Sequence, residues 1–168
     1  MAAKKFLRLV SGVITEIFGV QSSAGAGNAG DIVALDDTGR IDNSMMPIGV
    51  GTDTAVVTSS ENLAAGDWVN IWNNSGAKAR KADATSAGKE AHGFVLSAVT
   101  SGNPATVYFE GTNTQVSGQT PGNVFLQTTA GLGGPTAPSS AGNVVQQVGV
   151  ATSATTVNFE RGIAVTLV

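Results

Sequence analysis

The only histidine of the chain, His92, is the side chain best suited to acid–base chemistry near neutral pH. Glu90 lies two positions before it and could share a strand face with it, as a carboxylate that orients an imidazole would. The chain, however, has no cysteine and no G-x-S-x-G pattern to supply an activated nucleophile. His92 also aligns with Val148 in the internal repeat described below. We therefore predict a half-buried structural histidine, no catalytic residue and no enzymatic activity.

Two glutamates, Glu110 and Glu160, occupy the same place in the related segments TVYFEG and TVNFERG. A pair of carboxylates is the constellation that glycoside hydrolysis uses. Equivalent positions in two copies of a repeat favour a structural role instead, such as accepting a hydrogen bond from a backbone N–H at a strand end. We interpret both glutamates in this way.

Acidic residues gather in the stretch AGDIVALDDTGRID, which holds Asp31, Asp36, Asp37 and Asp42. A calcium loop needs oxygen ligands at alternate positions, whereas Asp36 and Asp37 are adjacent. The matching turns further on, NNSG at 73–76 and TTAG at 128–131, replace the acids by amides and hydroxyls. We therefore predict that the aspartates form turns, with a divalent cation at Asp36, Asp37 and Asp42 as the alternative. We expect no metal site and no cofactor.

Two tryptophans, Trp68 and Trp72, are four positions apart and so lie on one face of a predicted strand. Trp68 aligns with Val124, which predicts a core position. Trp72 aligns with Asp36 and Thr128, which predicts a partly exposed indole. Exposed indoles are frequent anchors of protein interfaces, and a carbohydrate platform is the alternative. We predict that Trp72 is a partner-binding residue.

These residues are carried by a repeated phrase, in which small–Gly–[Asp/Asn] precedes an apolar run and a polar turn that ends in Gly. Gly66 and Gly93 are 27 positions apart, as are Gly122 and Gly149. Alternating apolar residues predict half-buried strands, and Asx/Ser-Gly clusters predict hairpin turns. We predict an all-β fold with a compact barrel or sandwich body built from duplicated β-meander units. The body is expected to span residues 28–168, with units at about 29–62, 65–111 and 121–162.

Composition limits the classes of partner. Only 12% of the residues are charged and the formal net charge is −3, which argues against a nucleic-acid partner, because neutralising phosphates needs a basic patch. The densest basic cluster, Lys78, Arg80 and Lys81, has only three residues. No apolar run approaches the roughly 18 residues of a membrane span. Arg8 and Glu16 interrupt the apolar N-terminal stretch, which leaves too short a segment for a signal peptide. We expect no nucleic-acid partner and no membrane partner, and the low charge favours a surface partly covered by protein.

Residues 1–27 are predicted to form an extended N-terminal arm with a hinge. Segments 6–10 and 13–18 are apolar and β-prone, and the small-residue stretch SSAGAGNAG follows them. Such an arm would be costly to leave in water, so we expect it to dock on another chain or on the body. Its predicted partner-binding residues are Phe6, Leu7, Leu9, Ile14, Ile17 and Phe18.

Two stretches resemble proteins of tailed bacteriophages. The phrase GDIVALDDTGRIDNSMMPIGVG is similar to segments of phage virion proteins. The stretch AAGDWVNIWNNSGAKARKADATSAGKEAHGFVLSAVTSGNPATVYFEG resembles the β-rich bodies of head decoration (capsid cement) proteins. The resemblance covers roughly residues 28–162, and phrases of this kind also occur in tail-fibre proteins. The apolar N-terminal arm departs from the shortest cement proteins.

The resemblance implies a structural virion protein, assembled in the host cytoplasm, that decorates the outer capsid surface and clamps adjacent major capsid protein subunits. Such proteins are often trimers and sometimes dimers, so we expect a homo-oligomer, with a trimer favoured. The family has no catalytic residue to carry over. Residues 4–20 would add β-structure to the capsid protein or to a sister subunit. The alternative is a tail-fibre or spike module that binds a receptor or carbohydrate through Trp72, Tyr108 and the polar turns.

Overall fold

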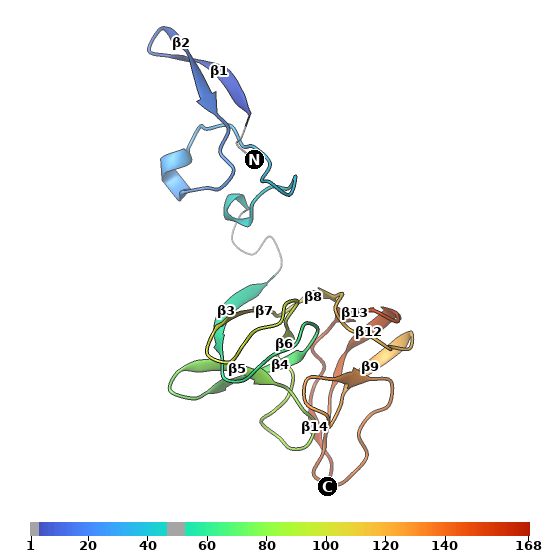
Figure 1. The fold of residues 1–168 in the computed structure, drawn as a ribbon. Coiled ribbons are helices and arrows are strands. Elements are labelled where there is room, and N and C mark those ends of the chain that lie inside the picture. The colour runs from blue at the N-terminus through green and yellow to red at the C-terminus, as the bar shows by residue number, and fades with distance from the viewer. Residues whose placement is uncertain (1–3, 47–52) are drawn as a thin grey trace. The chain divides into compact units, whose positions relative to one another are not determined.

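The computed structural model describes residues 4–46 and 53–168 (Figure 1). The chain divides into two compact units, residues 1–51 and residues 52–168. The regular elements of the described residues are β-strands and two short 3₁₀ helices. The prediction of an all-β fold is confirmed.

The N-terminal unit is built on a β-hairpin rather than on a single extended arm. Strands β1 (Lys5–Val10) and β2 (Val13–Phe18) pair antiparallel in continuous register. The two turn residues, Ser11 and Gly12, have φ values of 50° and 83°, as the common two-residue hairpin turn requires. The predicted β-character of this segment therefore takes the form of a local hairpin.

The chain after the hairpin folds back along it. Val20 forms a parallel bridge with Val33, and its N–H donates to the Ile32 carbonyl at 2.8 Å. The Ser23 N–H donates to Ser44 Oγ at 2.8 Å. The remaining elements of this unit are the 3₁₀ helices η1 (Gly25–Asn28) and η2 (Asn43–Met45). Residues 29–46 thus belong with the hairpin.

The division of the chain differs from the sequence prediction. The predicted boundary lay between residues 27 and 28, whereas the units divide at residues 51/52. The predicted first copy of the repeat, residues 29–62, is split between the units and does not form a meander in its described part. Its second phrase, residues 46–51, lies outside the described residues except for Met46. The segment that begins at Gly30 therefore differs in structure from the similar segments that begin at Gly66 and Gly122, because its tertiary partners differ.

The first half of the body is a closed barrel, and its strands follow the order β3-β5-β4-β6-β7. The pairs are antiparallel except for β3 with β5, which are parallel and close the barrel. Its strands are β3 (Thr54–Ser59), β4 (Trp68–Asn73), β5 (Ala77–Lys81), β6 (Gly93–Phe94) and β7 (Pro104–Tyr108).

The second half is an open antiparallel sheet in the order β10-β9-β12-β13-β8. Its strands are β8 (Gly111–Asn113), β9 (Gly122–Leu126), β10 (Gly133–Gly134), β12 (Gln147–Ser153) and β13 (Thr156–Phe159). A small pair, β11 (Val144–Val145) with β14 (Val165–Thr166), adjoins it along the chain. Figure 1 shows this sheet beside the barrel strands.

The two halves have the same strand order, which supports the duplication read from the last two units. Chain order matches β3, β4, β5, β6 and β7 with β8, β9, β10, β12 and β13, and both groups pair in the corresponding sequence. A Cβ on Gly93 would lie 2.4 Å from the Tyr108 carbonyl oxygen, and one on Gly149 would lie 2.1 Å from that of Asn158. The equivalent glycines therefore permit the same close strand contact in both halves.

Two apolar cores stabilise the body. One fills the barrel and contains Val69, Ala79 and Val107. The other lies between the outer wall of the barrel and the second sheet, and joins Trp68 and Phe94 to Val124, Leu126, Val148, Val157 and Phe159. Successive residues of β4 alternate between these cores because side chains alternate across a strand. The predicted core position of Trp68 is confirmed, since its side chain is fully buried.

Candidate interaction surfaces

The aspartates of the N-terminal unit hold turns. Asp36 Oδ1 accepts hydrogen bonds from the backbone N–H groups of Thr38 at 2.8 Å and Arg40 at 3.0 Å. The Thr38 hydroxyl and these backbone donors keep the pKa of Asp36 below its usual value. Asp42 caps η2 by accepting from the Ser44 N–H at 2.9 Å. The prediction of turn-forming aspartates is confirmed at these two positions.

Within residues 4–46 and 53–168, no three histidine or acidic side chains are placed where they could hold a metal ion. Asp67 accepts instead from the Ala64 N–H at 2.7 Å and lies 3.3 Å from the Lys81 ammonium. Burial raises the pKa of Asp67 despite these two partners. Its carboxylate therefore links a turn to β5.

His92 packs its ring against the barrel. Its Nδ1 accepts a hydrogen bond from the Ile71 N–H at 3.0 Å. Burial lowers the pKa of His92, and the positive charge of Arg161 lowers it further. The neutral imidazole thus satisfies a backbone donor of β4, which is a structural role. The ring is half-buried, as predicted.

Glu110 has the role predicted for it. Its Oε1 accepts from the Asp53 N–H at 3.2 Å, just before β3 begins. The glutamate thereby ties the end of β7 to the start of its neighbour β3. Glu160 lies at the corresponding place after β13 and is exposed.

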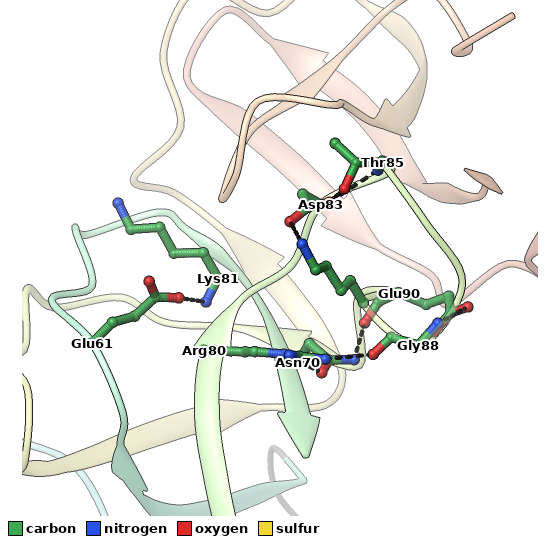
Figure 2. A network of polar contacts seen from close by, with 9 residues as sticks. Glu61, Asn70, Arg80, Lys81, Asp83, Thr85, Gly88 and Glu90 are labelled. Atoms are coloured by element: carbon green, nitrogen blue, oxygen red, sulfur yellow. Dashed lines mark hydrogen bonds and ion pairs between the residues drawn. The ribbon is translucent and has the colours of Figure 1, made fainter. Parts of the chain in front are cut away.

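Figure 2 shows a polar network that joins β4 and β5 to the loop of residues 82–92. Asn70 Nδ2 donates to the Glu90 carbonyl at 2.7 Å, and Asn70 Oδ1 accepts from Arg80 Nε at 3.0 Å. Arg80 Nη2 donates to the Gly88 carbonyl at 2.6 Å, and the Gly88 N–H donates to Glu90 Oε1 at 2.9 Å. These bonds fix the loop against the outer wall of the barrel.

A second part of this network holds the start of the same loop. Asp83 accepts from the Thr85 N–H and hydroxyl and from the Lys89 ammonium, which lies at 3.1 Å (Figure 2). Burial would raise the pKa of Asp83, but these donors outweigh it and leave the pKa lowered. The network therefore gives hydrogen-bond partners to the charged side chains of the loop, Asp83, Lys89 and Glu90.

Trp72 lies beside this network and is half-buried. The Arg80 guanidinium lies over its ring, 4.5 Å from the centroid, and its Nε1 donates to Ser60 Oγ at 3.2 Å. One face of the indole is therefore covered, which makes it a poor open platform for a sugar ring. The predicted partial exposure is confirmed, but the contact with Arg80 was not predicted. It follows from the strand register, which places Asn70 opposite Arg80.

The predicted arm residues lie on both faces of the β1–β2 hairpin. One face carries Leu7, Leu9, Ile14 and Phe18, whose side chains are 70%, 68%, 69% and 53% exposed. The charges of Lys5 and Glu16 on that face pair with each other at 2.7 Å. Phe6 and Ile17 pair on the opposite face and are partly buried. The six predicted residues are therefore brought together in one hairpin, while Trp72 belongs to the other unit.

None of the residues 4–46 is buried. Of the 17 exposed large hydrophobic side chains in the described residues, 11 lie in this segment. Besides the hairpin, they include Ile32, Val33 and Leu35, each more than half exposed. A two-stranded hairpin is only marginally stable when no apolar layer covers it. This unit is therefore an apolar surface without a core of its own.

Comparisons of the chain with protein-family models, curated proteins and solved structures found no match. In the described ranges, no helix is long and apolar enough to cross a membrane. The exposed apolar side chains of the N-terminal unit therefore make it the principal candidate for a functional contact.

Proposed function

We propose that the protein is a non-enzymatic structural component of a bacteriophage virion that decorates the outer capsid surface. In this proposal the N-terminal unit anchors the protein on adjacent major capsid protein subunits. The observation that carries the proposal is the absence of any buried side chain in residues 4–46. The resemblance of residues 28–162 to phage virion and cement proteins supports a phage capsid as the assembly to which the protein binds.

The energetics favour docking through the hairpin face that carries Leu7, Leu9, Ile14 and Phe18. Burial of a large apolar side chain contributes roughly 1.5–3 kcal/mol, before the costs of ordering the partners. Four such side chains give a gross gain of about 6–12 kcal/mol per copy on that scale. A symmetric capsid presents many equivalent sites, so linked copies bind more tightly than one copy does.

The test is co-sedimentation of the purified chain with expanded capsid-protein shells. Ile14→Asp and Phe18→Asp should each reduce binding at least about tenfold, because each places a charge in the face that docking would bury. Ile163→Asp is the matched control, since Ile163 is 89% exposed but lies in the body. Binding that survives both hairpin changes, or that is lost equally in the control, would refute this docking mode.

The alternative, a tail-fibre or spike module that binds carbohydrate, rests on Trp72. The covered face of its indole gives this alternative less support than the exposed hairpin gives capsid binding. Glycan-array binding that disappears in Trp72→Ala, together with no binding to shells, would reverse the order of the two proposals.

A further inference from the structure

Strand β1 has a free hydrogen-bonding edge. The Gly19 N–H donates to the Lys4 carbonyl at 3.3 Å, so the even-numbered residues of β1 are the ones that bond to β2. Backbone groups alternate in direction along an antiparallel strand, so those of Lys5, Leu7 and Leu9 point away from β2. Within the described residues, β1 pairs with no other strand. An apolar edge of this kind is a template for adding another strand.

The opposite edge of the hairpin is less suited to pairing. Just after β2, the Val20 N–H already donates to the Ile32 carbonyl, and the Val20 carbonyl accepts from the Ala34 N–H, each at 2.8 Å. Within β2, Glu16 is one of the residues whose backbone N–H and C=O groups point away from β1. Pairing β2 with its own copy about Glu16 would oppose two carboxylates, which destabilises a strand pair. β1 is therefore the available edge.

We propose that two copies of the chain pair through their β1 strands, antiparallel about a two-fold axis, with Leu7 of each copy opposite Leu7 of the other. The hairpins then form one four-stranded sheet in the order β2-β1-β1-β2. Because paired residues lie on the same face of a sheet, the apolar faces of the two hairpins become continuous.

Charge selects this register among its neighbours. With Leu7 on the axis, Lys5 lies opposite Leu9, and Phe6 lies opposite Arg8, where a guanidinium can pack on the ring. A register centred on Arg8 would oppose two guanidinium groups, and one centred on Phe6 would oppose Lys4 and Arg8. Like charges directly opposite each other are unfavourable in a strand pair. The Leu7-centred register alone among these three avoids them.

We assign an identical hairpin as the partner because the face with Leu7 carries no unpaired charge that would repel a second copy. The charges of Lys5 and Glu16, on the face with Leu7, already pair within each copy at 2.7 Å, so they leave no net charge to repel a second face. The two-stranded unit also gains the third and fourth strands that independent stability generally requires. This dimer differs from the trimer that the resemblance favours. It goes beyond the proposed function, because it can form from the purified chain alone and leaves the apolar face open for a capsid.

Single cysteines test this geometry cleanly because the chain has no cysteine of its own. The Cα atoms of the two Leu7 residues would be about 5.5 Å apart, within the range of a disulfide or a short bis-maleimide. The two Ile14 residues would be at least three strand spacings apart, about 14 Å or more. Ile14 is a matched control because it is 69% exposed and Leu7 is 70% exposed.

Light scattering of the wild-type chain should give about twice the chain mass of 16.8 kDa. Leu7→Cys should cross-link at least about tenfold faster than Ile14→Cys, because pairing raises its effective concentration. Leu7→Lys should be monomeric, with unchanged fluorescence from Trp68 and Trp72 as the check that the body remains folded.

A monomeric or trimeric mass at all concentrations, or equal cross-linking of the two cysteine variants, would overturn the dimer. Shell co-sedimentation measured in parallel separates this result from the proposed function. A monomer that still binds shells rejects only the dimer, and a cross-linkable dimer that ignores shells rejects only capsid binding.

Discussion

Replacing Gly93 and Gly149 by alanine, one at a time, tests the equivalence of the two halves of the body. Each glycine allows a neighbouring strand to approach closely, and a Cβ there would lie 2.4 Å or 2.1 Å from a carbonyl oxygen. Ordinary contacts begin at 3.4 Å, so the strands would have to separate by about 1.0 Å or 1.3 Å. We expect both substitutions to destabilise the body.

The magnitudes differ because the backbones differ. Overpacking of this kind costs about 1–3 kcal/mol, which is the expected loss for Gly93→Ala. Gly149 also has a φ of 140°, where an L-residue is strained by about 1–3 kcal/mol more. Gly149→Ala should therefore lose about 2–6 kcal/mol of unfolding free energy.

Gly142 provides the control for backbone strain alone. Its φ is 83° and a Cβ there would meet no atom within 4 Å, so Gly142→Ala should lose only about 1–2 kcal/mol. The assay is urea denaturation followed by tryptophan fluorescence, with the midpoint read at unchanged slope. If Gly149→Ala were no less stable than Gly142→Ala, the inferred close approach of β12 to β13 would be refuted.

Three further outcomes follow from the contacts of the body. Folding lowers the pKa of His92 below 6.5, so the contribution of the neutral imidazole to the free energy of unfolding should be fully present above pH 6.5 and should decrease as the pH falls below that value. His92→Asn should flatten this dependence in urea titrations at pH 5–7. A protonated His92 can no longer accept from the Ile71 N–H, and an unchanged profile in His92→Asn would contradict this assignment. Trp68→Ala should lose about 3–5 kcal/mol by leaving a cavity in the core between the barrel and the second sheet, measured by the midpoint of urea unfolding, and a loss below about 1 kcal/mol would show that the sheets can close the gap. Arg80→Ala should lose about 1–3 kcal/mol and shift the emission of Trp72, because it removes the cation over the ring and the network bonds; identical emission spectra would argue against that stacking.

Local patterns in the sequence predicted much of the body. The equal spacing of Gly66 to Gly93 and of Gly122 to Gly149 indicated two related units, and the two halves share one strand order. Alternation in TVYFEG predicted that Val107 would face a core, and it does. These predictions succeed because the side-chain period of a strand and the positive φ of a turn are set by neighbouring residues.

The unit boundary and the structure of the predicted first copy of the repeat, residues 29–62, were not predictable in this way. The segment that begins at Gly30 resembles the start of a body unit, yet its apolar residues Ile32, Val33 and Leu35 remain exposed in the N-terminal unit. A short apolar run is compatible with several partners, and only its long-range pairing, here with Val20, decides between them. The same limitation hid the contact between Trp72 and Arg80, which depends on the register of β4 and β5.

The sequence by itself therefore determined the all-β class, the duplicated body, the turn aspartates and the apolar character of residues 6–18, because each depends on local residue types and spacing. Tertiary structure decided that the first half closes into a barrel through a parallel β3–β5 pair while the second half stays open. It also decided that residues 4–46 form a hairpin unit with no buried side chain. These features depend on which distant segments pack together, and the free energy of that packing belongs to the whole chain and to its partners rather than to any short stretch of it.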